Sequence, residues 1–139
     1  IIGVEVCSAI KNIYAMVIGA GQSLNMSSSL FQKSLLEMKY LTKYFNGKET
    51  TVESLAGVGD LYVSAAGGRN SKMGDYLGKG FTFKSAKKKF MLKDTVEGEQ
   101  LAREIGPFIF KKINLQKIPL MINLLRSLLK NKKLNLKKL

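Results

Sequence analysis

The side chains that could do chemistry in this chain gather in one short stretch, residues 57–70. It contains a carboxylate (Asp60), a hydroxyl (Ser64), two adjacent glycines, and Arg69 followed by Asn70. Glycines let a backbone approach a ligand closely, and an arginine offers two parallel donors to phosphate oxygens. A helix expected to begin near residue 71 would aim free N–H groups at the same anion. The pattern predicts a phosphate-binding loop, and a solvated glycine-rich surface loop is the alternative.

A lone lysine, Lys11, interrupts the apolar segment of residues 4–20. Burying an unpaired ammonium is costly, so Lys11 must reach either water or a partner. Asn12 beside it adds two donors and an acceptor. A pair of Lys11 and Asp60 could move a proton to or from an alcohol while Arg69 holds a phosphate nearby. The set suits a small phosphorylated alcohol or ketone; the alternative is that Lys11 only marks the solvent edge of a helix.

Helices are predicted to position these residues. The apolar segment 4–20 predicts a buried helix that ends near Gly19 and Gly21. One narrow face of it carries small or polar side chains, which another element could approach closely: Ser8, Asn12, Ala15 and Gly19. Apolar spacing and start signals predict further helices over 30–44, about 50–55, 71–77, 82–89, 96 or 97 to 105, and 118–129.

Two local signals set the bounds of these helices. The serines at 27–29 are expected to cap the second helix, and Gly106 with Pro107 is expected to stop the helix before them. No segment alternates with the period of a strand. The sequence therefore predicts one all-α domain over residues 1–139.

The charge of +13, from 23 Lys plus Arg against 10 Asp plus Glu, favours an anionic partner. Two basic runs, 84–89 and 130–138, lack the interleaved aromatic residues of a nucleic-acid platform. We therefore interpret them as solvated lysine-rich faces and expect no nucleic-acid partner. No segment approaches about 20 uninterrupted apolar residues, so no membrane span is expected. A short packed helix or a frayed end is favoured for the tail, 130–139, over a helix on a membrane surface.

Histidine is absent, which excludes serine–histidine and cysteine–histidine catalysis and most zinc chemistry, so no metal site is expected. The single cysteine, Cys7, lies among apolar residues and is expected to be a small core residue. This cysteine usage is compatible with the cytoplasm. The chain begins with Ile1 and apolar residues, and we interpret it as a piece of a longer protein.

Several blocks of the chain resemble one family in order and spacing. This family is the NAD(P)-dependent sn-glycerol-3-phosphate dehydrogenases, and the resemblance is to their helical C-terminal domain. The matching blocks are residues 3–12, 55–61, 67–70, 74–80 and 96–98. The resemblance implies an all-α, multi-helix C-terminal domain of the 6-phosphogluconate-dehydrogenase-like type. It also implies interconversion of sn-glycerol 3-phosphate and dihydroxyacetone phosphate with NAD or NADP, which supplies glycerophospholipid precursors.

The same resemblance implies roles for individual residues. Lys11 would be the catalytic proton acceptor, with Asp60 orienting it and the reacting oxygen. A nearby carboxylate favours the ammonium form of a lysine, which suits reduction of dihydroxyacetone phosphate, where Lys11 acts as the acid. The substrate-binding set would be Lys11, Asn12, Asp60, Ser64, Gly68, Arg69 and Asn70. The cofactor-binding set would be Arg69, Thr95 and Glu97.

The chain departs from the family pattern at two positions. Gly68 stands where some members have a serine, so it can offer only backbone, and Ser64 stands where threonine is frequent. No Gly-x-Gly-x-x-Gly follows a strand, so the dinucleotide-binding domain and the family's second lysine are expected upstream of Ile1. The isolated chain is then expected to be inactive.

Two other readings remain open. The chain could be a non-catalytic basic helical module that binds nucleic acid, or the helical domain of another hydroxyacid or sugar-acid dehydrogenase. A homodimer is expected from the family and from the apolar faces of residues 4–20 and 118–129.

Overall fold

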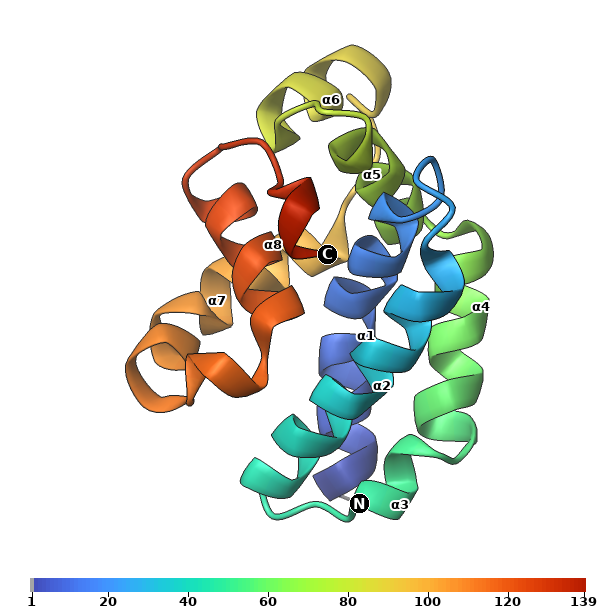
Figure 1. Ribbon diagram of the computed structural model, residues 1–139, viewed down its shortest axis with the longest axis vertical. Coiled ribbons are helices and arrows are strands. Elements are labelled where there is room, and N and C mark those ends of the chain that lie inside the picture. The colour runs from blue at the N-terminus through green and yellow to red at the C-terminus, as the bar shows by residue number, and fades with distance from the viewer. Residues whose placement is uncertain (1) are drawn as a thin grey trace.

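The computed structural model describes residues 2–139, which form helices and no strand (Figure 1). This confirms the all-α prediction. The α-helices are α1 (Ile2–Ala20), α2 (Ser27–Tyr44), α3 (Glu49–Val52), α4 (Asp60–Gly67), α5 (Arg69–Gly78), α6 (Phe83–Phe90), α7 (Glu97–Lys112) and α8 (Pro119–Leu129). A π-helical turn, η1 (Leu55–Gly59), precedes α4, and two 3₁₀ turns, η2 (Leu115–Lys117) and η3 (Leu136–Lys138), flank α8.

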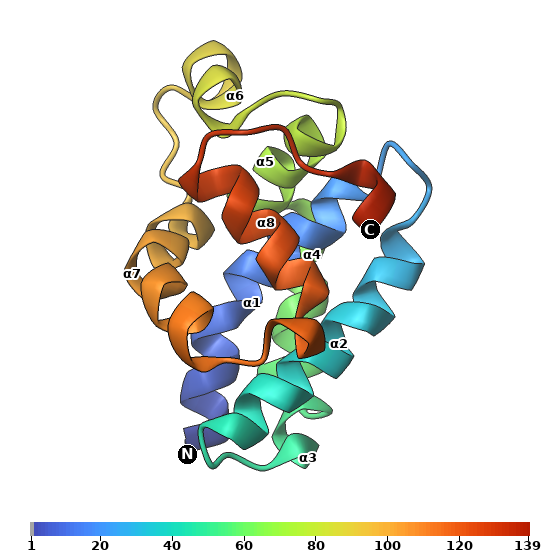
Figure 2. The same ribbon diagram turned by 60° about the vertical axis from the view of Figure 1, so that its left-hand side comes forward.

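Helix α1 lies at the centre of the fold, and α2, α4, α5, α7 and α8 all pack against it (Figures 1 and 2). All eight residues from Ile13 to Ala20 are buried. By length and composition α1 could cross a membrane, since it has 19 residues and a mean hydropathy of 1.4. From the sequence no membrane-spanning segment is expected; by length and composition alone, α1 is an exception. Because 56% of that apolar window is buried inside the protein, α1 serves here as the core helix.

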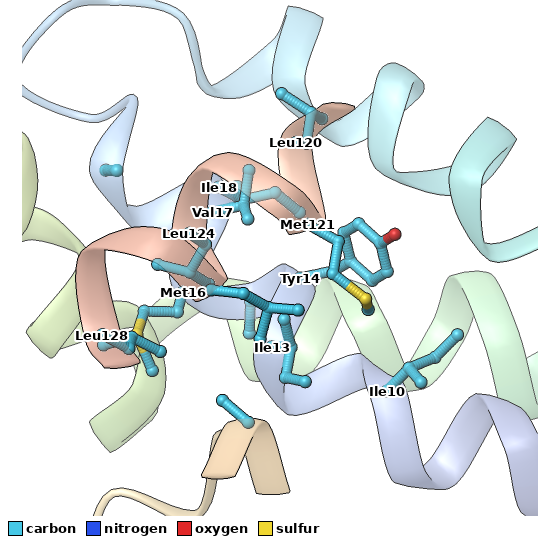
Figure 3. Close-up of a cluster of buried hydrophobic side chains, with 14 of the residues drawn as sticks. Ile10, Ile13, Tyr14, Met16, Val17, Ile18, Leu120, Met121, Leu124 and Leu128 are labelled. Carbon is cyan, nitrogen blue, oxygen red and sulfur yellow. The ribbon is translucent and has the colours of Figure 1, made fainter. Parts of the chain in front are cut away.

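The main core joins α1 to α8, as the buried side chains Ile13, Met16, Met121 and Leu124 show in Figure 3. The helices predicted over 4–20 and 118–129 are therefore confirmed as α1 and α8. Their apolar faces are buried against each other and against neighbouring helices. Near the start of α1, however, Val4 and Ala9 are exposed and Val6 is half-buried, so the homodimer stays a prediction.

Glycines bring the backbones of α1 and α5 into contact. A Cβ atom built on Gly19 would lie 2.1 Å from the Ser71 carbonyl oxygen, and one on Gly74 would lie 2.0 Å from the Met16 carbonyl oxygen. Neither distance is compatible with a side chain, so only glycine permits this packing. The close approach predicted for the Gly19 face of α1 is confirmed, and the element that approaches is α5.

Three element boundaries differ from the sequence prediction. Helix α2 begins at Ser27 with no side-chain cap, because its N-cap residue is Met26; the Ser27 hydroxyl donates to the Ile18 carbonyl oxygen, 3.4 Å away. Helix α3 ends at Val52, and the chain then enters the π-helical turn. Helix α7 continues through Pro107. Pro107 and Arg103 are both exposed, so the carbonyl that Pro107 leaves without an N–H partner can meet water.

The tail, 130–139, is packed against the protein. Leu134 and Leu139 are buried, and the Lys33 ammonium donates to the Leu139 carbonyl oxygen at 2.9 Å. This confirms the packed alternative, although the helical part is a single 3₁₀ turn, η3. The predicted core position of Cys7 is confirmed as well, since Cys7 is fully buried.

A buried carboxylate, Glu37, joins α2 to the start of α8. Its Oε1 accepts hydrogen bonds from the Tyr14 hydroxyl at 2.9 Å and the Met121 N–H at 3.1 Å, and its Oε2 accepts one from the Leu120 N–H at 2.8 Å. Burial raises the pKa of the Glu37 carboxyl, and the three hydrogen bonds offset part of that rise. Glu37 thus satisfies N–H groups that the first turn of α8 leaves without a partner.

Replacing Gly74 by alanine should destabilise the chain. We expect Gly74→Ala to lower the free energy of unfolding by about 1–3 kcal/mol or more, because its methyl group would force α5 away from α1. Urea denaturation measures the loss. Gly67→Ala is the matched control, because a Cβ atom on Gly67 meets nothing within 4 Å. Equal losses in the two variants would contradict the close packing.

Glu37→Gln should change how stability depends on pH. The folded-state pKa of Glu37 is raised above its ordinary value of 4.5, so its stabilising contribution is present below that value and is lost as pH rises through the folded pKa. The glutamine variant lacks this titration. The unfolding free energy of the wild type minus that of the variant should therefore fall between acidic and neutral pH. A difference that stays flat or rises, in denaturation curves across this range, would contradict the assignment.

Candidate functional site

The segment predicted as a glycine-rich loop, 57–70, is helical in the structure, so the loop prediction was wrong. The π-helical turn η1 leads directly into α4, which ends at Gly67. A Cβ atom on Gly57 would lie 2.0 Å from the Val52 carbonyl oxygen. Gly57 therefore allows a tight backbone turn against the end of α3. The sequence had instead predicted that the glycines of this stretch bring the backbone close to an anion. This turn makes Asp60 the first residue of α4.

Lys11 and Asp60 form an ion pair across α1 and α4. The Lys11 Nζ lies 3.6 Å from the Asp60 Oδ2, and the two side chains are 27% and 42% exposed. Lys11 therefore has both a partner and access to solvent, as the sequence required of it. An ion pair this exposed contributes only about 0–1 kcal/mol to stability. A substrate oxygen could displace the Asp60 carboxylate from Lys11 at little cost.

A second group of polar residues joins the start of α5 to the start of α7. An Arg69 guanidinium nitrogen lies 2.5 Å from the Glu97 Oε1. Asn70 is buried; its Nδ2 lies 3.5 Å from the Glu97 Oε2, and its Oδ1 accepts a hydrogen bond from the Gly98 N–H at 2.7 Å. Asn70 therefore caps α7 and fixes the position of Glu97. The sequence did not predict this capping role, because Asn70 and Gly98 are 28 residues apart.

Gly98 brings this second group up to α1. A Cβ atom on Gly98 would lie 2.9 Å from the Asn70 Oδ1, 3.0 Å from the Asn12 carbonyl oxygen and 3.0 Å from the Met16 Cε. The start of α7 thus touches the turn of α1 that carries Lys11 and Asn12. The group of Arg69, Asn70 and Glu97 consequently lies beside the turn of α1 from which Lys11 reaches Asp60, and we call these residues together the candidate face.

The remaining predicted residues lie around this face with fewer contacts. Ser64 is half-buried on α4, and its carbonyl oxygen accepts a hydrogen bond from the Gly68 N–H at 3.3 Å. Gly68 precedes α5 in an extended conformation, with φ −76° and ψ 172°. Thr95 is exposed just before α7, and Asn12 is half-buried on α1. Among residues 2–139, the side chains of Asn12, Ser64 and Thr95 make no hydrogen bond to protein, so their polar groups can meet a ligand.

The face pairs each cation with a carboxylate. Lys11 faces Asp60 and Arg69 faces Glu97, and Arg69 is 54% exposed. No group of three or more potential metal ligands occurs within residues 2–139, in line with the absence of histidine. The arrangement can move a proton at Lys11 and can bind an anion at Arg69.

The chain matches the family described as NAD-dependent glycerol-3-phosphate dehydrogenase C-terminus over residues 1–136. The chain therefore belongs to the C-terminal domain family of the NAD-dependent glycerol-3-phosphate dehydrogenases. This confirms the resemblance seen in the sequence. The family also accounts for the all-α fold, and it favours the dehydrogenase interpretation over a nucleic-acid-binding module.

Curated relatives that match this chain are named glycerol-3-phosphate dehydrogenase [NAD(P)+]. A glycerol-3-phosphate dehydrogenase [NAD(P)+] of Lactobacillus delbrueckii subsp. bulgaricus is 39% identical over 93 residues, which cover 63% of this chain and 28% of the relative. That of Campylobacter lari is 35% identical over 109 residues, covering 74% of this chain and 36% of the relative. The chain thus spans only about a third of the length of these curated relatives.

Solved structures agree with the fold. The glycerol-3-phosphate dehydrogenase of Coxiella burnetii superposes with a TM-score of 0.82 at 30% identity, over 96% of this chain and 42% of that one. The structure titled DsGPDH of Dunaliella salina gives a TM-score of 0.78 at 24% identity, over 92% and 24% of the two chains. Because its identity is only 24%, the Dunaliella salina structure supports the fold alone. The catalytic, substrate and cofactor roles of single residues stay predictions.

Proposed function

We propose that this chain is the substrate-binding and proton-transferring domain of an NAD(P)-dependent glycerol-3-phosphate dehydrogenase. The reaction would interconvert sn-glycerol 3-phosphate and dihydroxyacetone phosphate. The observation that carries the proposal is the contact of the start of α7, where Glu97 pairs with Arg69, with the turn of α1 that carries Lys11, the partner of Asp60. Family membership gives this arrangement its substrate.

Lys11 is the proton donor and acceptor in this proposal. In the reducing direction, its ammonium donates a proton to the C2 oxygen of dihydroxyacetone phosphate; in the oxidising direction, its amine takes the proton from the C2 hydroxyl. Asp60, 3.6 Å from the Lys11 Nζ, holds the lysine in place and stabilises its charged form. The rate enhancement comes from positioning and electrostatics, with no covalent intermediate.

Arg69 binds the substrate phosphate. Its guanidinium has five N–H donors, and Glu97 occupies only part of this fork, so donors remain for phosphate oxygens. Arg69 and Asn70 also open α5, whose first N–H groups favour an anion. Asn12 and Ser64 supply further hydrogen bonds, and Gly68 offers its backbone.

When bound, NAD or NADP would supply the hydride chemistry at C2 of the substrate. The described residues contain no strand and the sequence has no Gly-x-Gly-x-x-Gly loop, so a separate nucleotide-binding domain must hold most of the cofactor. The start of α7 would contact one end of it, since the Glu97 carboxylate and the exposed Thr95 hydroxyl are groups that can hydrogen-bond ribose or amide groups. Arg69, 54% exposed, completes this set on the same open face.

A homodimer and a cytoplasmic location belong to the same proposal and rest on the family. The state of Cys7 suits a reducing compartment, because the thiol is buried and has no disulfide partner. Burial raises the pKa of the Cys7 thiol, which keeps it unreactive.

Lys11→Ala should abolish turnover of the full-length enzyme. Loss of the proton donor should lower kcat for dihydroxyacetone phosphate by at least about 100-fold, with the melting temperature nearly unchanged. Steady-state NADH and NADPH oxidation measures this. Lys39→Ala is the control, because it breaks another lysine–carboxylate pair, with Glu53 at 2.5 Å, on a different face. Near-normal kcat in Lys11→Ala would remove Lys11 from the chemistry.

Arg69→Ala should weaken binding of the phosphorylated substrate. We expect KM for dihydroxyacetone phosphate to rise by about 10–100-fold, since hydrogen bonds to a charged group are lost. Arg69→Lys should restore part of this, because it keeps the charge but not the fork. Arg103→Ala, which breaks the ion pair of Arg103 with Glu99 on α7, is the control. An unchanged KM in Arg69→Ala would exclude Arg69 from the phosphate site.

A further inference from the structure

The C-terminal part of the chain has an unusual charge distribution. Residues 105–139 contain no Asp or Glu, although they contain nine lysines and arginines. The ion pairs within residues 2–139 all join residues numbered 103 or lower. The nine cations therefore have no carboxylate partner within the described part of the chain. This differs from the proposed active site, where each cation is paired.

Four of these cations surround one hollow. The hollow has a volume of about 390 Å³ and lies between α8 and the tail, 130–139, which runs back over α8 (Figure 2). Its cationic lining consists of Arg126, Lys132, Lys133 and Lys138, and no acidic residue lines it. Like charges gathered within about one Debye length, roughly 8 Å at physiological salt, repel each other. A bound anion with several charges would remove that repulsion.

Hydrogen bonds hold the walls of this basic pocket in place. Asn123 on α8 donates to the Asn135 carbonyl oxygen at 2.9 Å and accepts from the Asn135 N–H at 3.2 Å. The Ser127 hydroxyl donates to the Lys132 carbonyl oxygen at 2.7 Å. Arg126 lies over the Phe110 ring, 6.0 Å from its centroid, which restrains the guanidinium. The backbone of the pocket walls is therefore preformed, and only the exposed lysine side chains would need to order on binding.

The position of the tail leucines argues against a membrane as the ligand. Leu134 and Leu139 are buried in the protein, with 6% and 8% exposure, whereas Leu136 is exposed at 36%. Two of the three tail leucines are thus used by the fold, which leaves only one free for a lipid surface. A surface helix that binds lipid needs a free apolar face. The ligand that fits is a hydrophilic anion of small size.

We propose that the basic pocket binds a small organic polyphosphate, of the size and charge of a nucleoside triphosphate. The volume lies within the range of small-molecule sites. The four cations would bind the phosphate chain. Gln116, with Leu115 and Ile122 on the apolar floor, would contact the organic part. No residue of this pocket belongs to the proposed active site, so the inference does not rest on the proposed function.

Calorimetric titration of the full-length protein with tripolyphosphate and with ATP, at about 0.15 M salt, tests this site. To keep the proposed active site and cofactor site out of the signal, the titrations use a protein background carrying Arg69→Ala and saturated with NAD. We expect one site per chain for each ligand. AMP should bind at least about tenfold more weakly than ATP, since fewer charges meet the four cations.

A matched pair of variants separates a defined pocket from general attraction by a basic surface. Lys132→Ala with Lys133→Ala should weaken ATP binding by about tenfold or more. Lys111→Ala with Lys112→Ala removes the same amount of charge from residues 105–139, at exposed positions outside the pocket. This second pair should weaken ATP binding by less than about threefold. Thermal melting should show that both double variants are folded.

Several outcomes would overturn the proposal. Absence of ATP binding, or equal losses in the two double variants, would exclude a defined polyphosphate site. Weaker binding of ATP than of tripolyphosphate would exclude the organic part of the ligand. Tighter binding of a single-stranded RNA or of anionic lipid vesicles, lost equally in both double variants, would replace the pocket with a macromolecular surface.

Discussion

The contact between the backbones of α1 and α5 determines where Arg69, Asn70 and, through Asn70, the start of α7 lie relative to α1. Gly19 and Gly74 carry no side chain at the points where the two helices touch. With α5 fixed at this distance, Ser71 lies against Gly19, and Asn70 reaches Gly98 at the start of α7, which touches the turn of α1 that carries Lys11. Asn70 then holds Glu97 and Gly98 at the start of α7. A shift of α5 would therefore move Arg69, the Asn70 cap of α7 and Glu97 together.

The paired charges at this face suit a site that must exchange partners. The pairs of Lys11 with Asp60 and of Arg69 with Glu97 are partly exposed, so each contributes little to stability. They nevertheless hold two long, flexible side chains in defined positions before a substrate arrives, which lowers the entropy lost on binding. The face is also open, and catalysis of hydride transfer requires exclusion of water. A second domain covering the face would meet both needs.

The sequence predicted the parts of this protein that depend on local periodicity. Helices α1 and α8 followed from runs of apolar residues, and Lys11 stood out because it interrupts one of them. The π-helical turn before Asp60 was not predictable, because glycines at 57 and 59 also fit a loop; only the position of the Val52 carbonyl explains them. The role of Asn70 depends on Gly98, 28 residues away, and no local pattern records such a contact.

The fold uses its excess positive charge in two different ways. Around α1, carboxylates from neighbouring helices compensate the cations, so an incoming anion must compete with Asp60 or Glu97. Residues 105–139 contain no Asp or Glu and no acidic residue lines the basic pocket, whose walls are held by the hydrogen bonds of Asn123 and Ser127. Mutual repulsion there is a cost that the buried Leu134 and Leu139 must offset. An anion that binds this pocket would remove the cost, so binding there should stabilise the tail against α8.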